Sequence, residues 1–205
     1  MLYSLLHFLL ATFFSVVFRW KVTGTENIPA TGGVIIAANH VSLWDPPVVG
    51  TAIPRRIHFM AKEELFVNPI FRWLITKLGA FPVRRGKADR TAIRTALTLL
   101  ENGSVLGIFP EGTRSKTGKL GVPEPGLAML ALKAGVPIVP AAVTGTNKVF
   151  RDGHLLPKFK VSFGKPLVLR RSTDGNDSLE AMSNTVMTEI AQLLEKETNS
   201  YNKIS

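Results

Sequence analysis

A histidine and an aspartate stand five positions apart in the segment NHVSLWD, residues 39–45. The apolar run before this segment predicts a buried strand, and Asp45 precedes two prolines, a pattern typical of a helix start. A carboxylate bonded to one ring nitrogen of a histidine fixes its tautomer and raises the basicity of the other nitrogen. His40 and Asp45 therefore suggest a general base that removes a proton from a hydroxyl. The alternative is a core histidine next to an aspartate that only caps a helix.

A second polar segment, FPEGTRS at residues 109–115, has the residue types that bind phosphate. Gly112 allows a tight turn and a close approach of the backbone to an anion. Thr113 offers a hydroxyl, and Arg114 offers a fork of donors that suits a phosphate. Glu111 either orients this arginine or bonds a substrate hydroxyl. The alternative is a polar surface turn with a weak ion pair.

Two further segments follow predicted strands. Residues 79–87, GAFPVRRGK, end in Arg84, Arg85 and Lys87, and two arginines can share a phosphomonoester. The alternative for these bases is a solvated face attracted to anionic lipid. Residues 136–140, VPIVP, form an apolar strand between prolines, which we expect to support the floor of the site or a wall of an acyl pocket.

The elements that must position these segments alternate between strands and helices. This alternation predicts an α/β sheet flanked by helices, with the polar segments at the carboxyl ends of the strands. We expect strands at residues 34–38, 57–60, 80–83, 105–109, 138–144 and 158–163. We expect helices from Asp45 and at residues 68–78, 90–101, 126–134 and 178–196.

Composition excludes several classes of protein. The chain has 205 residues, 45% of them hydrophobic, which favours one folded domain over disorder. It has no cysteine, which excludes disulfides, thiolate metal sites and a cysteine nucleophile. The four histidines are scattered, so no metal site is expected. A formal net charge of +10 favours an anionic partner: nucleic acid, a membrane surface or a phosphorylated substrate.

The first 18 residues contain no charged side chain, and Arg19 and Lys21 follow them around Trp20. This arrangement differs from a secretory signal and favours a membrane anchor with its basic, aromatic end at the cytoplasmic interface. Partial insertion and a full span both remain open, and the alternative is a helix that covers the core of the domain. We therefore divide the chain into a membrane-associating helix, residues 1–21, and a domain, residues 22–205.

Taken together and in this order, NHVSLWD, GAFPVRR, FPEGTRS and VPIVP resemble the four blocks of the glycerolipid acyltransferase family. The resemblance runs from about residue 22 to about residue 165 and is strongest to the bacterial 1-acylglycerol-3-phosphate acyltransferases. It implies a mixed α/β sheet flanked by helices, like that of glycerol-3-phosphate acyltransferase, with an N-terminal membrane-associating helical part. It also implies no metal, no tightly bound cofactor and no covalent acyl-enzyme.

The resemblance assigns roles residue by residue. It makes His40 the general base and Asp45 its orienting partner. It places Arg85, Glu111, Gly112 and Arg114 around the glycerol phosphate of lysophosphatidic acid, and the hydroxyl of Thr113 makes that residue a further candidate for substrate binding. Acyl-CoA or acyl carrier protein supplies the acyl thioester, and phosphatidic acid is the product. Backbone N–H groups near the turn after Phe109 are the candidates for binding the oxyanion.

Three other functions remain as alternatives. The first keeps the chemistry but changes the acceptor to glycerol 3-phosphate or another lysophospholipid. The second is a non-enzymatic basic module; nucleic acid is disfavoured because the basic stretch lacks interleaved aromatic residues and any binding motif. The third is a hydrolase, which is disfavoured because the sequence has no G-x-S-x-G elbow for a nucleophilic serine.

Overall fold

The computed structural model describes residues 2–84, 86, 89–150, 153, 155–171 and 178–202. Within these residues, seven strands form one sheet in the order β1-β7-β6-β2-β5-β3-β4. Neighbouring strands are parallel except β6 and β7, which are antiparallel. The strands are β1 (Lys21–Thr23), β2 (Val34–Ala38), β3 (Ile57–Lys62), β4 (Phe81–Val83), β5 (Val105–Ile108), β6 (Ile138–Thr144) and β7 (Lys160–Phe163). The predicted mixed α/β sheet is confirmed.

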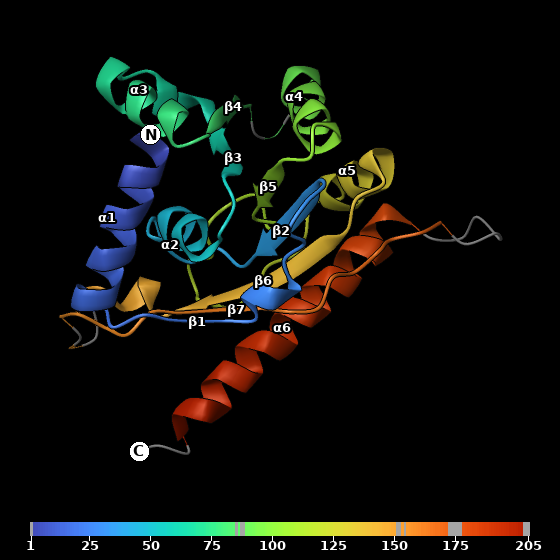
Figure 1. The fold of residues 1–205 in the computed structure, drawn as a ribbon. Coiled ribbons are helices and arrows are strands. Elements are labelled where there is room, and N and C mark those ends of the chain that lie inside the picture. Colours follow the sequence, from blue (N-terminus) through green and yellow to red (C-terminus); the bar gives the residue numbers. More distant parts are fainter. Residues whose placement is uncertain are drawn as a thin grey trace.

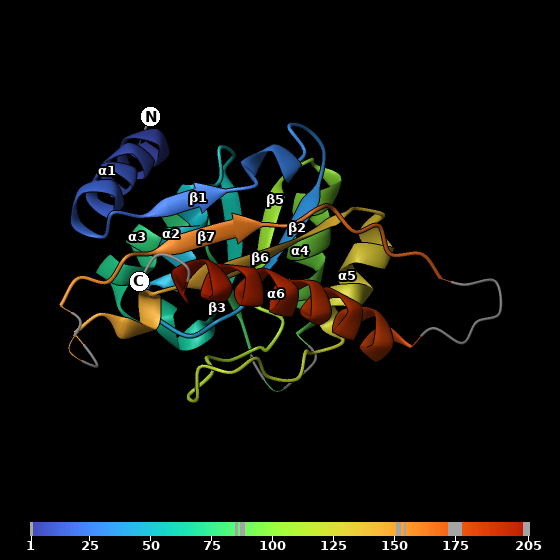
Figure 2. The same cartoon turned by 90° about the horizontal axis from the view of Figure 1, so that it is seen from below.

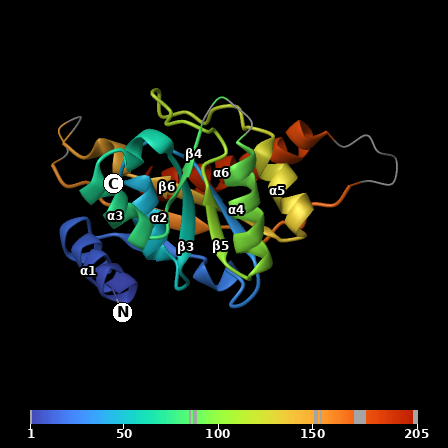
Figure 3. The ribbon, with the colours of Figure 1, turned by 90° about the horizontal axis from the view of Figure 1, so that it is seen from above.

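Helices cover both faces of this sheet (Figure 1). The α-helices are α1 (Leu2–Val17), α2 (Asp45–Ala52), α3 (Pro69–Lys77), α4 (Arg90–Glu101), α5 (Gly126–Ala134) and α6 (Leu179–Asn202). Short 3-10 helices are η1 (Thr25–Asn27), η2 (Glu63–Phe66) and η3 (Thr146–Lys148). Figure 3 shows α1, α2 and α3 on one side of the strands and α4 and α5 on the other, and Figure 2 shows α6 running across the sheet.

The central strand β2 divides the core in two. Val34, Ile36 and Ala38 face a cluster that includes residues of α1 and α2, whereas Ile35 and Ala37 face a cluster that includes residues of α4, α5 and α6. Alternate residues of a strand point to opposite faces, so a strand covered on both sides is apolar throughout. This is why the continuous run 34–38 correctly predicted a buried strand.

Several sequence expectations differ from the structure: β3 runs to Lys62 rather than to residue 60, and β7 begins at Lys160 rather than at residue 158. The terminal helix α6 runs to Asn202, six residues beyond the predicted end at 196. Strand β1 was not predicted, because three residues are too few for an alternating pattern to be recognised. It is ordered by parallel pairing to β7, from Lys21 with Lys160 to Thr23 with Ser162.

Helix α1 has two different faces. Phe14 is fully buried and Phe18, just after the helix, is 2% exposed, with its ring stacked on Phe159 at 4.0 Å between centroids. On the other face Phe8 is 66% and Val16 is 73% exposed. Among the described residues, no helix combines the length and the apolar character needed to cross a membrane. The domain boundary between residues 21 and 22 stays a prediction.

Two phenylalanines of α1 test how far this helix belongs to the core. Phe14→Ala removes a buried ring, so we expect it to lower the free energy of unfolding by about 3–5 kcal/mol. Phe8→Ala is the matched control in the same helix and should change stability by only about 0.5 kcal/mol, because Phe8 is exposed. Urea unfolding followed by circular dichroism measures both. Equal losses in the two variants would contradict the packing of α1.

Candidate active site

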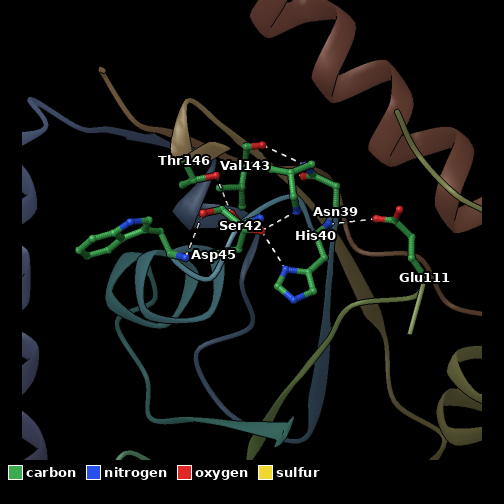
Figure 4. Close-up of polar contacts among 9 residues, drawn as sticks. Asn39, His40, Ser42, Asp45, Glu111, Val143 and Thr146 are labelled. Atoms are coloured by element: carbon green, nitrogen blue, oxygen red, sulfur yellow. Dashed lines mark hydrogen bonds and ion pairs between the residues drawn. The ribbon is translucent and has the colours of Figure 1, made fainter. Parts of the chain in front are cut away.

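The site is built around the carboxylate of Asp45, the first residue of α2, which is fully buried. His40 Nδ1 donates to Asp45 Oδ2 at 2.8 Å (Figure 4). The same oxygen accepts the backbone N–H groups of Val41 at 2.6 Å and Ser42 at 2.7 Å. The hydrogen bond that the spacing of His40 and Asp45 suggested is therefore present. Through these backbone bonds Asp45 also fixes the turn between itself and His40. The two side chains therefore stay within hydrogen-bonding distance of each other.

The second carboxylate oxygen is held from a distant part of the chain. Thr146, in η3 after β6, is 1% exposed and donates from Oγ1 to Asp45 Oδ1 at 2.6 Å. Every polar contact of Asp45 is thus with a donor, the pattern that suits an ionised, acceptor-only carboxylate. His40 then carries its proton on Nδ1 and leaves Nε2 with a free lone pair.

Asn39 anchors the end of β2 to β6. Its side-chain amide donates to the carbonyl of Val143 at 3.0 Å, and its Oδ1 accepts the N–H of Val143 at 2.7 Å. The parallel pairing of these strands ends at Ala38 with Ala141, so Asn39 extends the ladder with a side chain. These two bonds fix Asn39, the residue immediately before His40, and bring η3, with Thr146, to the site.

The loop after β5 binds the main chain of His40 on both sides. The N–H of His40 donates to Glu111 Oε1 at 3.0 Å, and the carbonyl of His40 accepts the N–H of Ser115 at 2.8 Å. Glu111 is 8% exposed, and its other oxygen accepts the N–H of Gly121 at 2.9 Å. The sequence assigned Glu111 to an arginine or a substrate hydroxyl; the structure places it on the backbone of His40 instead.

The imidazole also rests on an aromatic ring. The rings of His40 and Phe109 are stacked, with centroids 4.1 Å apart and planes at 21°, and Phe109 stacks in turn on Phe59 of β3. Gly107 makes room for this stack, since a Cβ there would lie 2.2 Å from the ring of Phe59. Asp45 bonds the ring of His40 at Nδ1, Phe109 packs on the face of the ring, and Glu111 and Ser115 bond its backbone. Nε2 therefore points away from Asp45 (Figure 4). This geometry suits removal of a proton from a bound hydroxyl.

The other predicted binding residues of this loop lie between Glu111 and Ser115, the two residues that bond the backbone of His40. Gly112 has a φ of 66° and closes a turn in which its N–H bonds the carbonyl of Phe109 at 3.0 Å. Thr113 and Arg114 are exposed, and Arg114 directly precedes the residue bonded to His40. The two polar segments therefore meet at one edge of the sheet, because β2 and β5 are parallel neighbours.

Arg84 directly follows β4, which is separated from β5 by β3. Arg84 Nε lies 3.5 Å from Glu63 and 3.7 Å from Asp89, so this guanidinium is close to two carboxylates. Arg85, the second predicted phosphate ligand, lies outside the described residues, as does Lys87.

Two other histidines, His7 and His58, each lie near a backbone carbonyl group. His7 lies 3.2 Å from the carbonyl of Ile53, and His58 lies 3.1 Å from that of Gly79. Burial lowers the pKa of His58, and the positive charge of Arg56 lowers it further. In the described ranges no three His, Asp or Glu side chains gather closely enough to hold a metal ion.

Thr146 is the residue of this site that sequence reasoning missed. It lies 101 positions from Asp45, and a threonine after a strand has no distinctive signal in one sequence. Asn39 was part of the recognised segment, but its bonds to Val143 required the alignment of β2 with β6.

Comparisons with known proteins agree with this geometry. Residues 19–144 match the family model described as Acyltransferase. A Bacillus subtilis (strain 168) protein named 1-acyl-sn-glycerol-3-phosphate acyltransferase is 38% identical over 152 residues, which cover 72% of this chain and 73% of that protein. A Streptococcus pneumoniae protein of the same name is 32% identical over 198 residues, 91% of this chain and 72% of its own.

A solved structure is also similar over almost the whole chain. The crystal structure of the 1-acyl-sn-glycerophosphate (LPA) acyltransferase PlsC from Thermotoga maritima superposes with a TM-score of 0.79 at 30% sequence identity. The match covers 96% of this chain and 79% of that one. The family model and these relatives together show that the chain belongs to the acyltransferase family.

Proposed function

We propose that this protein is a 1-acyl-sn-glycerol-3-phosphate O-acyltransferase. It transfers an acyl group from an acyl thioester to the free hydroxyl of lysophosphatidic acid and produces phosphatidic acid for phospholipid synthesis. The observation that carries the proposal is the buried His40–Asp45 pair, in which the backbone of His40 is bonded to the loop that contains Arg114. The names of the relatives support the same acceptor.

The proposed reaction needs one base and one ternary complex. Nε2 of His40 takes the proton of the acceptor hydroxyl as its oxygen attacks the thioester carbonyl. The tetrahedral intermediate then expels the thiolate, which takes the proton from His40 and leaves as a thiol. Asp45 stabilises the imidazolium that forms between these steps. Because donor and acceptor react directly, holding them in one site supplies much of the rate.

The acceptor's phosphate is proposed to bind beside this base. Gly112 forms the turn, and the exposed residues Thr113 and Arg114 present a hydroxyl and a guanidinium. Arg85 is proposed as a further phosphate ligand on the strength of the sequence resemblance. Glu111 contributes by holding the N–H of His40, and so acts as a positioning residue. The acyl donor is proposed to be acyl-CoA or acyl carrier protein.

The protein is proposed to act at the cytoplasmic surface of the cell membrane, with α1 as a monotopic anchor. The supporting observation is the outer face of α1, where Leu5, Phe8, Leu9 and Val16 are more than half exposed. Apolar side chains at such density on one helix face are typical of a helix that lies in the membrane interface.

Replacing the base tests the reaction. We expect His40→Ala to lower acyl transfer to lysophosphatidic acid by at least about 10²–10⁴-fold, the usual contribution of general acid–base catalysis. Purified protein, a labelled acyl thioester and separation of the one-chain and two-chain lipids measure it. His58→Ala is the matched control and should retain transfer. Wild-type activity in His40→Ala refutes the mechanism, and faster transfer to glycerol 3-phosphate or another lysophospholipid refutes the acceptor.

Thr146 provides a test of how Asp45 is oriented. Thr146→Val keeps the shape but removes the donor to Asp45 Oδ1, so we expect kcat to fall about tenfold or more while the acceptor KM stays unchanged. Leaving a buried acceptor without a partner should also lower the free energy of unfolding by about 1–3 kcal/mol. Thr146→Ser keeps the hydroxyl and should restore kcat. A serine variant as slow as the valine variant would exclude the hydroxyl as the cause.

Arg114 tests the phosphate site. A charge-assisted hydrogen bond contributes about 1.5–3 kcal/mol, so Arg114→Ala should raise the KM for lysophosphatidic acid about 10–100-fold. We expect a much smaller change in kcat, since Arg114 is not proposed to touch the reacting atoms. Arg94→Ala, on the exposed side of α4, is the control for loss of one positive charge. Steady-state kinetics with an unchanged KM in Arg114→Ala would move the phosphate elsewhere.

A further inference from the structure

Helix α3 is an apolar helix without buried residues. It contains Ile70, Phe71, Trp73, Leu74 and Ile75, yet no residue of the helix is buried. Ile70 is 79% exposed and Trp73 is 55% exposed, and Val67 just before the helix is 80% exposed. An exposed patch of large apolar side chains marks an interaction surface more often than a free surface.

The helix is nevertheless well formed. Asn68 accepts the N–H groups of Ile70 and Phe71 at 3.0 Å each, and Pro69 occupies the first turn. Local capping therefore stabilises the helix, and packing within the domain involves only partly buried side chains such as Leu74 and Ile75. Hollows of about 490 Å³ and 270 Å³ lie against the helix. Arg72 and Thr76 line both, with Phe66 and Val67 in the larger one and Trp73 in the smaller one. The described part of the chain leaves these apolar walls open.

Positive charge accompanies this surface. Arg72 and Lys77 belong to α3, which contains no acidic residue, and Arg56 donates to the carbonyl of Lys77 at 3.3 Å. The neighbouring acids of η2 lie close to bases: Glu64 is 2.9 Å from Lys62, and Glu63 is 3.5 Å from Arg84. A surface that combines apolar side chains, a tryptophan and bases is complementary to anionic phospholipid.

The surface also continues toward the exposed face of α1. The guanidinium of Arg56 lies over the ring of Tyr3 at 5.3 Å and bonds α3 at the same time, so this arginine joins the two helices. Leu2 and Leu5, at the same end of α1, are 39% and 55% exposed. Figure 1 shows the N-terminal end of α1 beside α3.

We infer that α3 is a second membrane-contacting element. Val67, Ile70, Phe71 and Trp73 enter the lipid layer, and Arg56, Arg72 and Lys77 contact the phosphate groups of anionic phospholipids. This inference rests on the proposed function, because a lipid acceptor requires the protein at a membrane. A second copy of the chain suits the surface less well, since α3 offers no acid to pair with the bases of a copy.

Matched substitutions test the apolar contact. We expect Ile70→Ser to weaken binding to vesicles of phosphatidylcholine and phosphatidylglycerol about tenfold, from the apolar area it removes. Val168→Ser, which follows β7, is the control at a side chain 63% exposed and should bind like the wild type. Vesicle sedimentation over a range of lipid concentrations measures both. Equal binding by the wild type and Ile70→Ser overturns the inference.

A charge reversal tests the basic rim. Arg72→Glu should weaken the same binding about fivefold for each unit of charge, and the loss should disappear on neutral phosphatidylcholine vesicles. Lys133→Glu, on the exposed side of α5, changes the net charge equally and is the control. If both variants lose the same affinity, the effect is one of net charge and α3 is not the contact.

The fluorescence of Trp73 reports contact with lipid directly, even where the affinity for vesicles does not change. Vesicles with brominated acyl chains should quench the tryptophan fluorescence of the wild type, and Trp73→Phe should remove most of that quenching. Unchanged quenching in Trp73→Phe overturns the inference. Light scattering of the wild type tests whether a second copy of the chain occupies this surface. A dimer that Ile70→Ser dissociates would assign the surface to a second copy and would also overturn the inference.

Activity on soluble substrates separates this inference from the proposed function. With a short-chain lysophosphatidic acid that stays monomeric in water, we expect Ile70→Ser and Arg72→Glu to transfer acyl groups at wild-type rates. Absence of transfer by the wild type would refute the proposed function whatever the vesicle data show. Normal transfer with unimpaired vesicle binding by both variants would refute only the inference.

Discussion

The carboxylate of Asp45 is the constraint on which the site depends. It accepts hydrogen bonds from the ring of His40, the N–H groups of Val41 and Ser42 and the hydroxyl of Thr146, all between 2.6 and 2.8 Å. A fully buried carboxylate is stable only when its oxygen lone pairs accept hydrogen bonds. Here the donors come from different parts of the turn and from η3. The same bonds that satisfy the charge fix the tautomer of His40, so stability and chemistry have one physical cause.

Sheet topology explains why segments far apart in the sequence meet at this carboxylate. Strands β6, β2 and β5 are adjacent and parallel, so the residues that follow them share one edge. Glu111 and Ser115 come from the loop after β5 and hold the backbone of His40, while Thr146 comes from the turn after β6. Position in the sheet, more than sequence proximity, thus determines which residues belong to the site.

The parts of this arrangement that depend on local patterns could be predicted from the sequence. The bounds of β2, α4, α5 and β6 match the predicted ranges, because buried runs, periodicity and glycine ends are local signals. The bond between His40 and Asp45 spans one turn and was predicted for the same reason. The bond from His40 to Glu111 and the bond from Thr146 to Asp45 depend on which strands are neighbours, and one sequence carries no signal of that order. Strand β1 was missed because its pairing with β7 is equally distant.

The N-terminal apolar run shows a different limit of sequence reasoning. Hydrophobicity alone does not say whether a side chain packs in the core or stays exposed, and α1 has one face of each kind: Phe14 is buried, and Phe8 is exposed. The sequence of α3 predicts an ordinary amphipathic helix, yet none of its residues is buried. Both helices lie on the side of the sheet that carries α2 (Figure 3), the helix that begins at Asp45. An enzyme whose acceptor is a lipid gains from this division, because the apolar area left uncovered by the fold is the area that a membrane can cover.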